Sequence, residues 1–361
     1  MASFLKSVFV ISIISQALSG TAGAWEIHRS LMPWVAARLT PQEITKLNQL
    51  VSVPAPVVTE SRYRDMARAL QLNPNGKLIS GSEKSGLQIL TLAVDDPDQG
   101  MDQDLPAAFD PGNERKFMGG MSGPTSQGFR HAFFGGWQIL HPITTFQVPL
   151  HAMGQAPERT RIFARFAREL FEQGDFAWGV RIIGWAMHYV QDLSQPFHAV
   201  QIPNLRMVPF SHLFTDLVPE TTRVISNYHW VYEGYTLEQI QSGQPSTLKT
   251  CLSETVKSEL HWDQTNPREN PADLTLEVAD ASLELASEMG SALVAFTLAA
   301  GIDLKDPKID LAHNIGSVDY RELATRPALA HERERLEKVT CLALRNGLDA
   351  SARLVQWALQ P

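Results

Sequence analysis

The chain has 361 residues and a formal net charge of −8, from 39 acidic and 31 basic side chains. No run of basic residues stands out, so the composition argues against a protein that is steered onto long polyanions such as duplex DNA. The length suits one large domain or two small ones. Because no internal repeat or low-complexity linker divides the sequence, we expect a single domain over residues 25–361.

The first 24 residues have the pattern of a secretory signal peptide. A short positive start precedes an apolar stretch at residues 8–14, and residues 22–24 (AGA) form a small-residue cleavage site. The apolar stretch is too short and too interrupted by serine to anchor the chain in a bilayer. The alternative is a buried N-terminal helix. Cleavage after Ala24 would make Trp25 the first residue of a secreted or periplasmic protein.

Apolar residues three and four positions apart predict helices along most of the chain. The expected helices span residues 28–39, 42–50, 156–173, 177–192, 278–300, 328–344 and 347–359. Gly174 and Asp175 separate two of them and indicate a helical hairpin. Long Pro-rich or polar segments, which we expect to be loops, cover residues 95–128, 199–226, 262–274 and 303–318. No run of alternating residues indicates a sheet, so the expected fold is all-α, a multi-helix bundle with long loops.

Two histidine–carboxylate pairs carry the functional signal. His188 and Asp192 are four residues apart, so their side chains project from the same face of a helix, and His198 follows just after Pro196. His229 and Glu233 repeat the spacing of four. Imidazole and carboxylate are the donors that zinc accepts where no thiolate is offered. Either pair alone could be only a helix-stabilising contact, but the two together in an exported helical protein indicate a metal site.

Two cysteines, Cys251 and Cys341, are the only ones in the chain, and neither has the spacing of a metal ligand. In an exported protein they could form one disulfide, but the sequence does not show whether their backbones come close. Two buried free thiols are an equal alternative at this point. Any metal ion must therefore be held by nitrogen and oxygen donors.

The motif HYVQDLSQPFH followed by NYHWVYE resembles the signature of the bacterial zinc-dependent phospholipases C. The zinc-dependent single-strand nucleases of fungi and plants are relatives of these enzymes. In this family the mature chain begins with a tryptophan whose α-amino nitrogen and carbonyl oxygen bind a metal ion. Trp25, directly after the expected cleavage site, matches that requirement.

The resemblance implies further ligands closer to the N-terminus. An early histidine of the family matches His28, and an aspartate in a P-D-x-x-x-D context matches Asp98. The rivals of Asp98 in the same acidic segment are Asp96, Asp102 and Asp104. A histidine before aromatic residues matches His131, in RHAFF, although His131 could instead be a surface residue of a loop. The family pattern covers the chain from Trp25 to about Glu233.

Three zinc ions are implied by the resemblance, in three connected sites. The first would use Asp98, His131 and His188, with Asp192 as a bridge to another site. The second would use His198, His229 and Glu233. The third would use Trp25, His28 and Asp192. The remaining histidines, which we interpret as structural or exposed, are His141, His151, His212, His261, His313 and His331.

The implied activity is that of a secreted phospholipase C. A metal-activated water would hydrolyse the glycerol-side phosphodiester bond of phospholipids such as phosphatidylcholine, giving diacylglycerol and a phosphorylated head group, with Asp98 as a catalytic residue that orients or deprotonates the water. The expected partners are a phospholipid substrate and, transiently, a membrane surface, with no duplex nucleic acid. We expect a monomer.

Two alternatives remain open on the sequence. A zinc-dependent single-strand nuclease would use the same chemistry, but the nucleases tend to have aspartate where this chain has Glu233. A non-catalytic zinc-binding protein would need coordination shells closed by protein ligands, and the ligands counted above leave each shell short. Phe133, Phe134 and Trp137 could form a cation–π wall for a quaternary-ammonium head group, or they could simply belong to the core.

Overall fold

The structure is a computed structural model. It describes residues 27–50, 60–70, 72–73, 78, 85–99, 101, 128–134, 137–140, 145–148, 153–200, 202–209, 218–254, 259–311 and 317–360. The expected signal peptide, its cleavage site, Trp25, Asp102 and Asp104 lie outside these residues.

A fully buried helix, α8 (Phe176–Leu193), forms the centre of the fold. Every residue from Trp178 to Leu193 is buried, including the polar side chains of the HYVQD segment. A helix that is apolar on all sides is stable only when other elements surround it. α7 (Ala156–Glu172), α5 (Gly86–Ala93) and the C-terminal helix supply this cover. The donors on α8 therefore face the protein interior.

The hairpin expected between the two helices at Gly174 is confirmed. Gly174 has a φ of +77°, a left-handed conformation that glycine adopts without strain. Its N–H donates to the carbonyl of Phe171, and the N–H of Asp175 donates to the carbonyl of Leu170. These two bonds make a Schellman motif, which ends α7 and turns the chain into α8.

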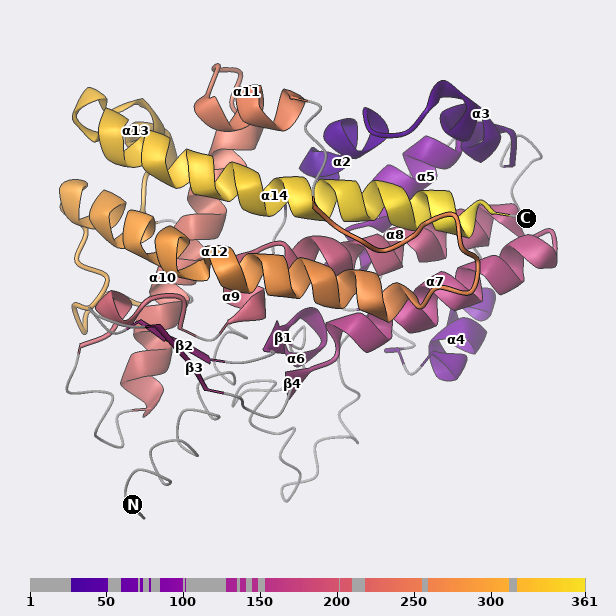
Figure 1. Cartoon of the computed structure of the whole chain (residues 1–361), viewed down its shortest axis with the longest axis horizontal. Coiled ribbons are helices and arrows are strands. Elements are labelled where there is room, and N and C mark those ends of the chain that lie inside the picture. The colour runs from indigo at the N-terminus through magenta and orange to yellow at the C-terminus, as the bar shows by residue number, and fades with distance from the viewer. Residues whose placement is uncertain are drawn as a thin grey trace, which may run out of the picture.

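Two long helices, α12 (Pro271–Ala299) and α14 (Ala330–Ala358), lie side by side and cover α7 and α8 (Figure 1). α12 begins seven residues before the expected position, because Asn270 caps it through the N–H of Ala272 and Pro271 occupies the first turn. α14 is one continuous helix, so the expected division into residues 328–344 and 347–359 is wrong. Gly347, the first residue of the second expected helix, instead lies inside α14 where it passes close to Ser194.

Replacement of Gly347 by alanine should destabilise the protein, because a Cβ atom there would lie 2.6 Å from both the Cβ and the Oγ of Ser194. Helix propensity alone would favour alanine by about 1 kcal/mol, but overpacking a close-packed interior costs about 1–3 kcal/mol. We therefore expect urea unfolding to show a lower free energy of unfolding. Gly243→Ala, with no atom within 4 Å of the added Cβ, is the matched control and should change little. Equal stabilities for the two variants would show that α14 moves away without strain.

The N-terminal helices pack on one side of this core. They are α2 (His28–Ala36), α3 (Pro41–Leu50), α4 (Glu60–Ala69) and α5. The first two confirm expected helices, whereas α4 and α5 were not expected. A short 3₁₀ helix, η2 (Asp96–Gln99), follows α5 and contacts α8. This contact brings an acidic segment to the HYVQD helix.

Further, mostly shorter elements complete the described part of the chain. They are α6 (Gly128–His131), α9 (Pro196–Ala199), η5 (Leu205–Met207), α10 (Val218–Gln241), α11 (Thr247–Ser253), α13 (Tyr320–Thr325) and η8 (Pro327–Leu329). α10 begins inside the segment expected to be a loop, because Pro219 falls in the first turn, where a missing N–H costs nothing. Two two-stranded antiparallel pairs join β1 (Phe133–Phe134) to β4 (Met153–Gly154) and β2 (Trp137–Leu140) to β3 (Thr145–Val148). Apart from these short pairs, the expected helical fold is confirmed.

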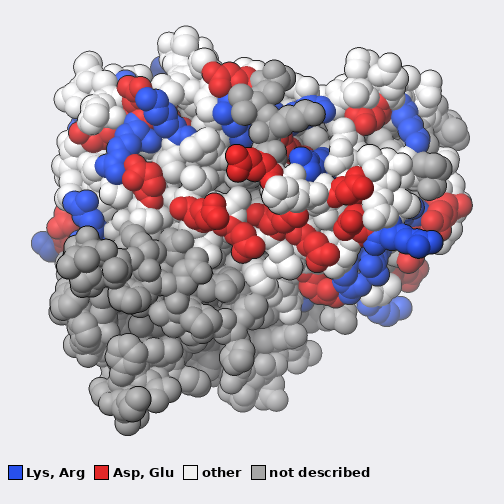
Figure 2. Space-filling view, viewed as in Figure 1, with Lys and Arg blue, Asp and Glu red and all other residues white. Residues whose placement is uncertain are grey.

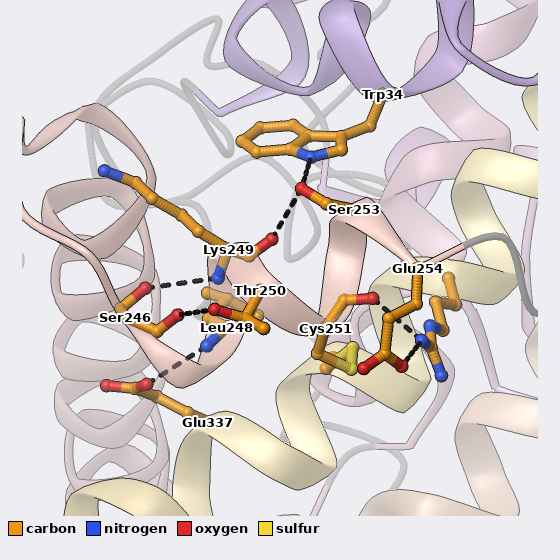
Figure 3. The surroundings of a disulfide bond; sticks show 11 residues. Trp34, Ser246, Leu248, Lys249, Thr250, Cys251, Ser253, Glu254 and Glu337 are labelled. Atoms are coloured by element: carbon orange, nitrogen blue, oxygen red, sulfur yellow. Dashed lines mark hydrogen bonds and ion pairs between the residues drawn. A yellow bond between two sulfur atoms is a disulfide. The ribbon is translucent and has the colours of Figure 1, made fainter.

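A disulfide joins Cys251 on α11 to Cys341 on α14, which resolves the alternative left open by the sequence (Figure 3). Further bonds fasten α11 on either side. Trp34 of α2 donates its indole N–H to Ser253, and Glu337 of α14 accepts the N–H of Leu248. α11 thus connects the first helix of the described chain to the last one. A disulfide of this kind is consistent with an oxidising compartment.

One face of the molecule carries a stripe of carboxylates along α12 (Figure 2). Its members are Asp273, Glu277, Asp280, Glu284 and Glu288, which recur every three or four residues. Lysine and arginine side chains lie elsewhere on the same face, and Arg335 pairs with Glu288 of the stripe. Among the described residues, no helix is long and apolar enough to cross a membrane.

Candidate metal centre

Three buried groups of histidine and carboxylate side chains meet at one end of α8. In each group the donor atoms lie within 4.8 Å of one another. The groups are His28, His188 and Asp192; Asp98, His131 and His188; and His198, His229 and Glu233. Every donor expected from the sequence that the structure describes belongs to one of them. The ligand role of each residue stays a prediction.

Donors from three elements, α8, α6 and η2, gather around His188. His188 and Asp192 are one turn apart on α8, with His188 Nε2 3.2 Å from Asp192 Oδ2. His131, at the end of α6, places its Nδ1 2.8 Å from the same Asp192 oxygen and 2.9 Å from His188 Nε2. Asp98, on η2, places Oδ1 3.3 Å from His188 Nε2. The spacing of four therefore does bring both α8 donors to one point.

Asp192 faces two groups with its two oxygen atoms. Oδ2 lies beside His131 and His188, whereas Oδ1 lies 3.3 Å from Nε2 of His28 on α2. The side chain is fully buried. A carboxylate in this position can bridge two cations, as the family resemblance implies for Asp192.

The group of His198, His229 and Glu233 depends on the turn after α8. α8 ends at Leu193, and Pro196 begins the short helix α9 that carries His198. Pro196 thus starts the next helix rather than simply ending the previous one, as proline at a first turn does. His229 and Glu233 lie one turn apart on α10, with His229 Nε2 2.7 Å from Glu233 Oε1. His198 Nε2 is 3.7 Å from the same oxygen.

Carbonyl groups fix the orientation of two histidine rings. His188 Nδ1 lies 2.8 Å from the carbonyl oxygen of Val94, and His198 Nδ1 lies 2.9 Å from that of His131. A carbonyl oxygen only accepts hydrogen bonds, so each Nδ1 carries a proton, and in the neutral form of each ring the lone pair is on Nε2. The lone pairs point toward the carboxylates of their groups. Protein ligands of metal ions are commonly held in this way.

Several donor atoms of these groups have no hydrogen-bond partner within the described part of the chain. They are both carboxylate oxygens of Asp98, Oδ1 of Asp192, and Nε2 of His131 and of His198. All are buried, and burying a polar atom without a partner costs free energy. A bound cation would satisfy lone pairs of this kind. The residues present therefore fit metal ions held by nitrogen and oxygen.

The charges of the groups depend on one another. Burial raises the pKa of Asp192, but the imidazoles of His188 and His131 outweigh it and hold this pKa well below its usual value. Burial likewise opposes the ionisation of Glu233, and His229 and His198 nevertheless lower its pKa to about 2. Burial lowers the pKa of His188, but the Asp192 and Asp98 carboxylates raise it well above 6.5. The metal-free groups thus form ion pairs.

Stability of the metal-free protein should be greatest between pH about 4.5 and 6.5. The raised pKa values of His188 and His198 stabilise the fold below the unfolded value near 6.5, and this contribution is lost as the pH rises through the folded values. The lowered pKa values of Asp192 and Glu233 stabilise it above the unfolded values near 4, and this contribution is lost as the pH falls.

Zinc binds neutral imidazole, so adding it should abolish the loss of stability above pH 6.5. Urea unfolding of chelator-treated protein from pH 4 to 9, with and without zinc, measures both effects. A profile that zinc leaves unchanged would contradict the coupling between the metal and these histidines.

Of the two described candidates in the acidic segment, Asp98 lies in one of the three groups and Asp96 does not. Asp96 is buried in an ion pair with Arg181 and accepts the indole N–H of Trp185, so it serves the core. Its carboxylate belongs to none of the three groups. Asp102 and Asp104, the other two candidates, lie outside the described residues.

Other expectations about site residues have mixed outcomes. His261 and His331 are exposed, as interpreted from the sequence. His141, His151, His212 and His313 lie outside the described residues. Phe134 is buried and Phe133 packs against the larger core, which favours the core alternative for both over a head-group wall.

Two glutamines next to the ligands were missed in the sequence. Gln195 donates from Nε2 to Glu233 Oε1 at 2.7 Å and lies 2.9 Å from His229 Nε2. Gln191 lies 2.9 Å from Nδ1 of His28. Both glutamines could have been noticed in the sequence, because they are polar residues inside the HYVQDLSQPFH motif. The other residues of this segment have the pattern of a completely buried helix.

No protein-family model and no curated protein matches the chain. Among solved structures, the chain is similar to an alpha-toxin from Clostridium absonum, with a TM-score of 0.33, 14% identity, and coverage of 95% of this chain and 66% of that one. An alpha-toxin from Clostridium perfringens, avian strain SWCP, gives a TM-score of 0.28 and 13% identity over 94% of this chain and 64% of that one. The chain thus spans just under two thirds of the length of each toxin chain.

Proposed function

We propose that this protein is an exported, zinc-dependent phospholipase C that hydrolyses the glycerol-side phosphodiester bond of phospholipids. One observation carries the proposal: the donors of the HYVQDLSQPFH and NYHWVYE motifs meet in adjoining buried groups, with Asp192 between two of them. A motif match alone would also occur in a protein whose histidines pointed to separate surfaces. The proposal therefore rests on the motif and on the convergence of its donors.

Zinc is the ion that this donor set favours. The groups offer imidazole nitrogen and carboxylate oxygen, and both cysteines are used in the disulfide. Asp98, His131, His188 and Asp192 would hold one ion, and His198, His229 and Glu233 a second. Trp25, which lies outside the described residues, would hold the third ion with His28 and Asp192.

Bound ions of this kind supply positive charge that stabilises the negative charge developing on a phosphate, and they make a water molecule more acidic. The contribution of the chain itself is to place the carboxylates. Asp98 has a side chain that is only 3% exposed, and its two oxygens make no hydrogen bond with the described residues. We propose that Asp98 orients the attacking water and accepts its proton.

The phospholipid is favoured over a nucleic acid by two features. Glu233 ends the second motif with glutamate, as in the phospholipases, whereas the related nucleases tend to have aspartate. The chain is acidic, and α12 presents a carboxylate stripe to solvent. A single-strand nuclease is the second candidate, because the same centre would cleave either phosphodiester. We further propose a monomer that touches the membrane surface only transiently.

The test is parallel hydrolysis of phosphatidylcholine, p-nitrophenylphosphorylcholine and single-stranded RNA by the processed protein. Hydrolysis of p-nitrophenylphosphorylcholine should disappear on treatment with a chelator and return with zinc. His229→Ala should reduce the rate by at least about 100-fold, the scale on which loss of a catalytic group acts, whereas His261→Ala at an exposed position should not change it. Cleavage of RNA without cleavage of lipid would establish the nuclease instead. Activity that is indifferent to chelator would reject both enzymes.

A further inference from the structure

Gln191 is a fully buried glutamine between two expected ligands of α8, and nothing in the proposed reaction uses it. Burying a primary amide is costly unless its carbonyl and its amino group both find partners. Leucine of similar size would fill the same space without that cost. The contacts of the Gln191 side chain explain why this position is polar.

Both ends of the Gln191 amide are bound, and they point in opposite directions. Oε1 lies 2.9 Å from Nδ1 of His28, and Nε2 donates to the hydroxyl of Ser351 at 3.2 Å. All three side chains are buried. Because a carbonyl oxygen only accepts, His28 must carry its proton on Nδ1. The lone pair of His28 Nε2 then faces Asp192, whose Oδ1 lies 3.3 Å away.

The His28 ring differs from its neighbours in what holds it. His188 and His198 each donate to a backbone carbonyl, which the fold keeps in one place. His28 donates to a side-chain amide, and an amide rotated by half a turn would present an N–H group to the ring. Ser351, on α14, accepts from the amide nitrogen in the orientation seen here, in which the oxygen faces His28.

We propose that Gln191, held by Ser351, is a positioning residue that fixes the ring and the tautomer of His28 and thereby retains the metal ion of the His28, His188 and Asp192 group. The inference rests on the metal centre of the proposed function but not on its substrate. It also gives α14, which lies beyond the segment covered by the family motif, a part in the metal centre.

The test compares Gln191→Leu, Gln191→Glu and Ser351→Ala as full-length processed proteins loaded with zinc. Metal content after dialysis against graded chelator concentrations gives the affinity for each ion. Gln191→Leu should bind one ion about 10–100-fold more weakly, the usual effect of removing a partner of a ligand, and keep the others. Gln191→Glu should retain that ion, since a carboxylate accepts the same bond. Ser351→Ala should weaken it by a few fold. Gln239→Leu, at another buried glutamine, is the matched control and should change nothing.

A second readout is specific to the positioning role. The ¹⁵N shifts of the metal-free wild type should show His28 protonated on Nδ1, and this pattern should persist in Gln191→Glu and become mixed in Ser351→Ala. If Gln191→Leu fails to fold, these two variants still decide. Suppose that the wild type binds its ions, and that Ser351→Ala and Gln191→Leu show the same ring shifts and lose zinc at the same chelator concentrations as the wild type. This result would overturn the inference about Gln191 but not the proposed function. A wild type that binds no metal ion would overturn the proposed function with it.

Discussion

Asp192→Asn should cost the protein more than one metal ion and nearly all of its activity. The two carboxylate oxygens face different groups, Oδ2 toward His131 and His188 and Oδ1 toward His28. Asparagine has nearly the same shape, but its oxygen is neutral and its amino group cannot bind a cation. We expect zinc affinity to fall at least about 100-fold at two sites, beyond the effect of losing an outer partner.

Metal analysis of the purified variant, with the wild type beside it, measures this directly. The site of His198, His229 and Glu233 should keep its ion, because Asp192 comes no closer than 4.0 Å to His198 and is not a member of that group. Asp280→Asn, at an exposed carboxylate of α12, controls for the loss of one negative charge. A variant that loses a single ion would exclude the bridging role of Asp192.

A methionine or a tag left in front of Trp25 should remove one zinc ion and most of the activity. The proposal assigns the α-amino nitrogen of Trp25 to the same ion as His28 and Asp192, and only a free amine can bind it. An α-amino group has an ordinary pKa near ~8, so it is readily deprotonated by a metal ion, whereas an amide nitrogen is not. An extended chain therefore lacks this donor.

The comparison needs two preparations of the same sequence, one with the extension and one from which a protease has removed it. Zinc content should rise by one ion on cleavage, and hydrolysis of p-nitrophenylphosphorylcholine should rise with it. The other two ions should be present in both preparations. Full zinc content and full turnover before cleavage would show that Trp25 is not a ligand.

Local patterns predicted α2, α3, α7 and α8 and most of α12 and α14. The hairpin at Gly174 follows from a glycine flanked by periodic segments, and the structure adds only its two capping hydrogen bonds. The break expected between residues 344 and 347 was wrong, and Gly347 is explained by the approach of Ser194, which follows α8. Tertiary contact of this kind leaves no local pattern. The early start of α12 was readable from Asn270 and Pro271, a cap followed by a first-turn proline.

The donors of the centre were predictable where chemistry and spacing coincide. His188 with Asp192, and His229 with Glu233, share a helical face because they are four residues apart. Asp98 could be separated from Asp96 only in the structure, since that choice depends on Arg181, which takes Asp96 into the core. Gln191 and Ser351 are 160 residues apart in the chain. No spacing rule connects them, and their contact arises from the packing of α14 on α8.

The central claim is that donors from across the chain hold metal ions in one centre, and the zinc content of the purified, processed protein tests it most directly. The account predicts three zinc ions per chain, removed by a chelator together with phosphodiester hydrolysis and restored with it. A processed protein that is free of metal and fully active would contradict it.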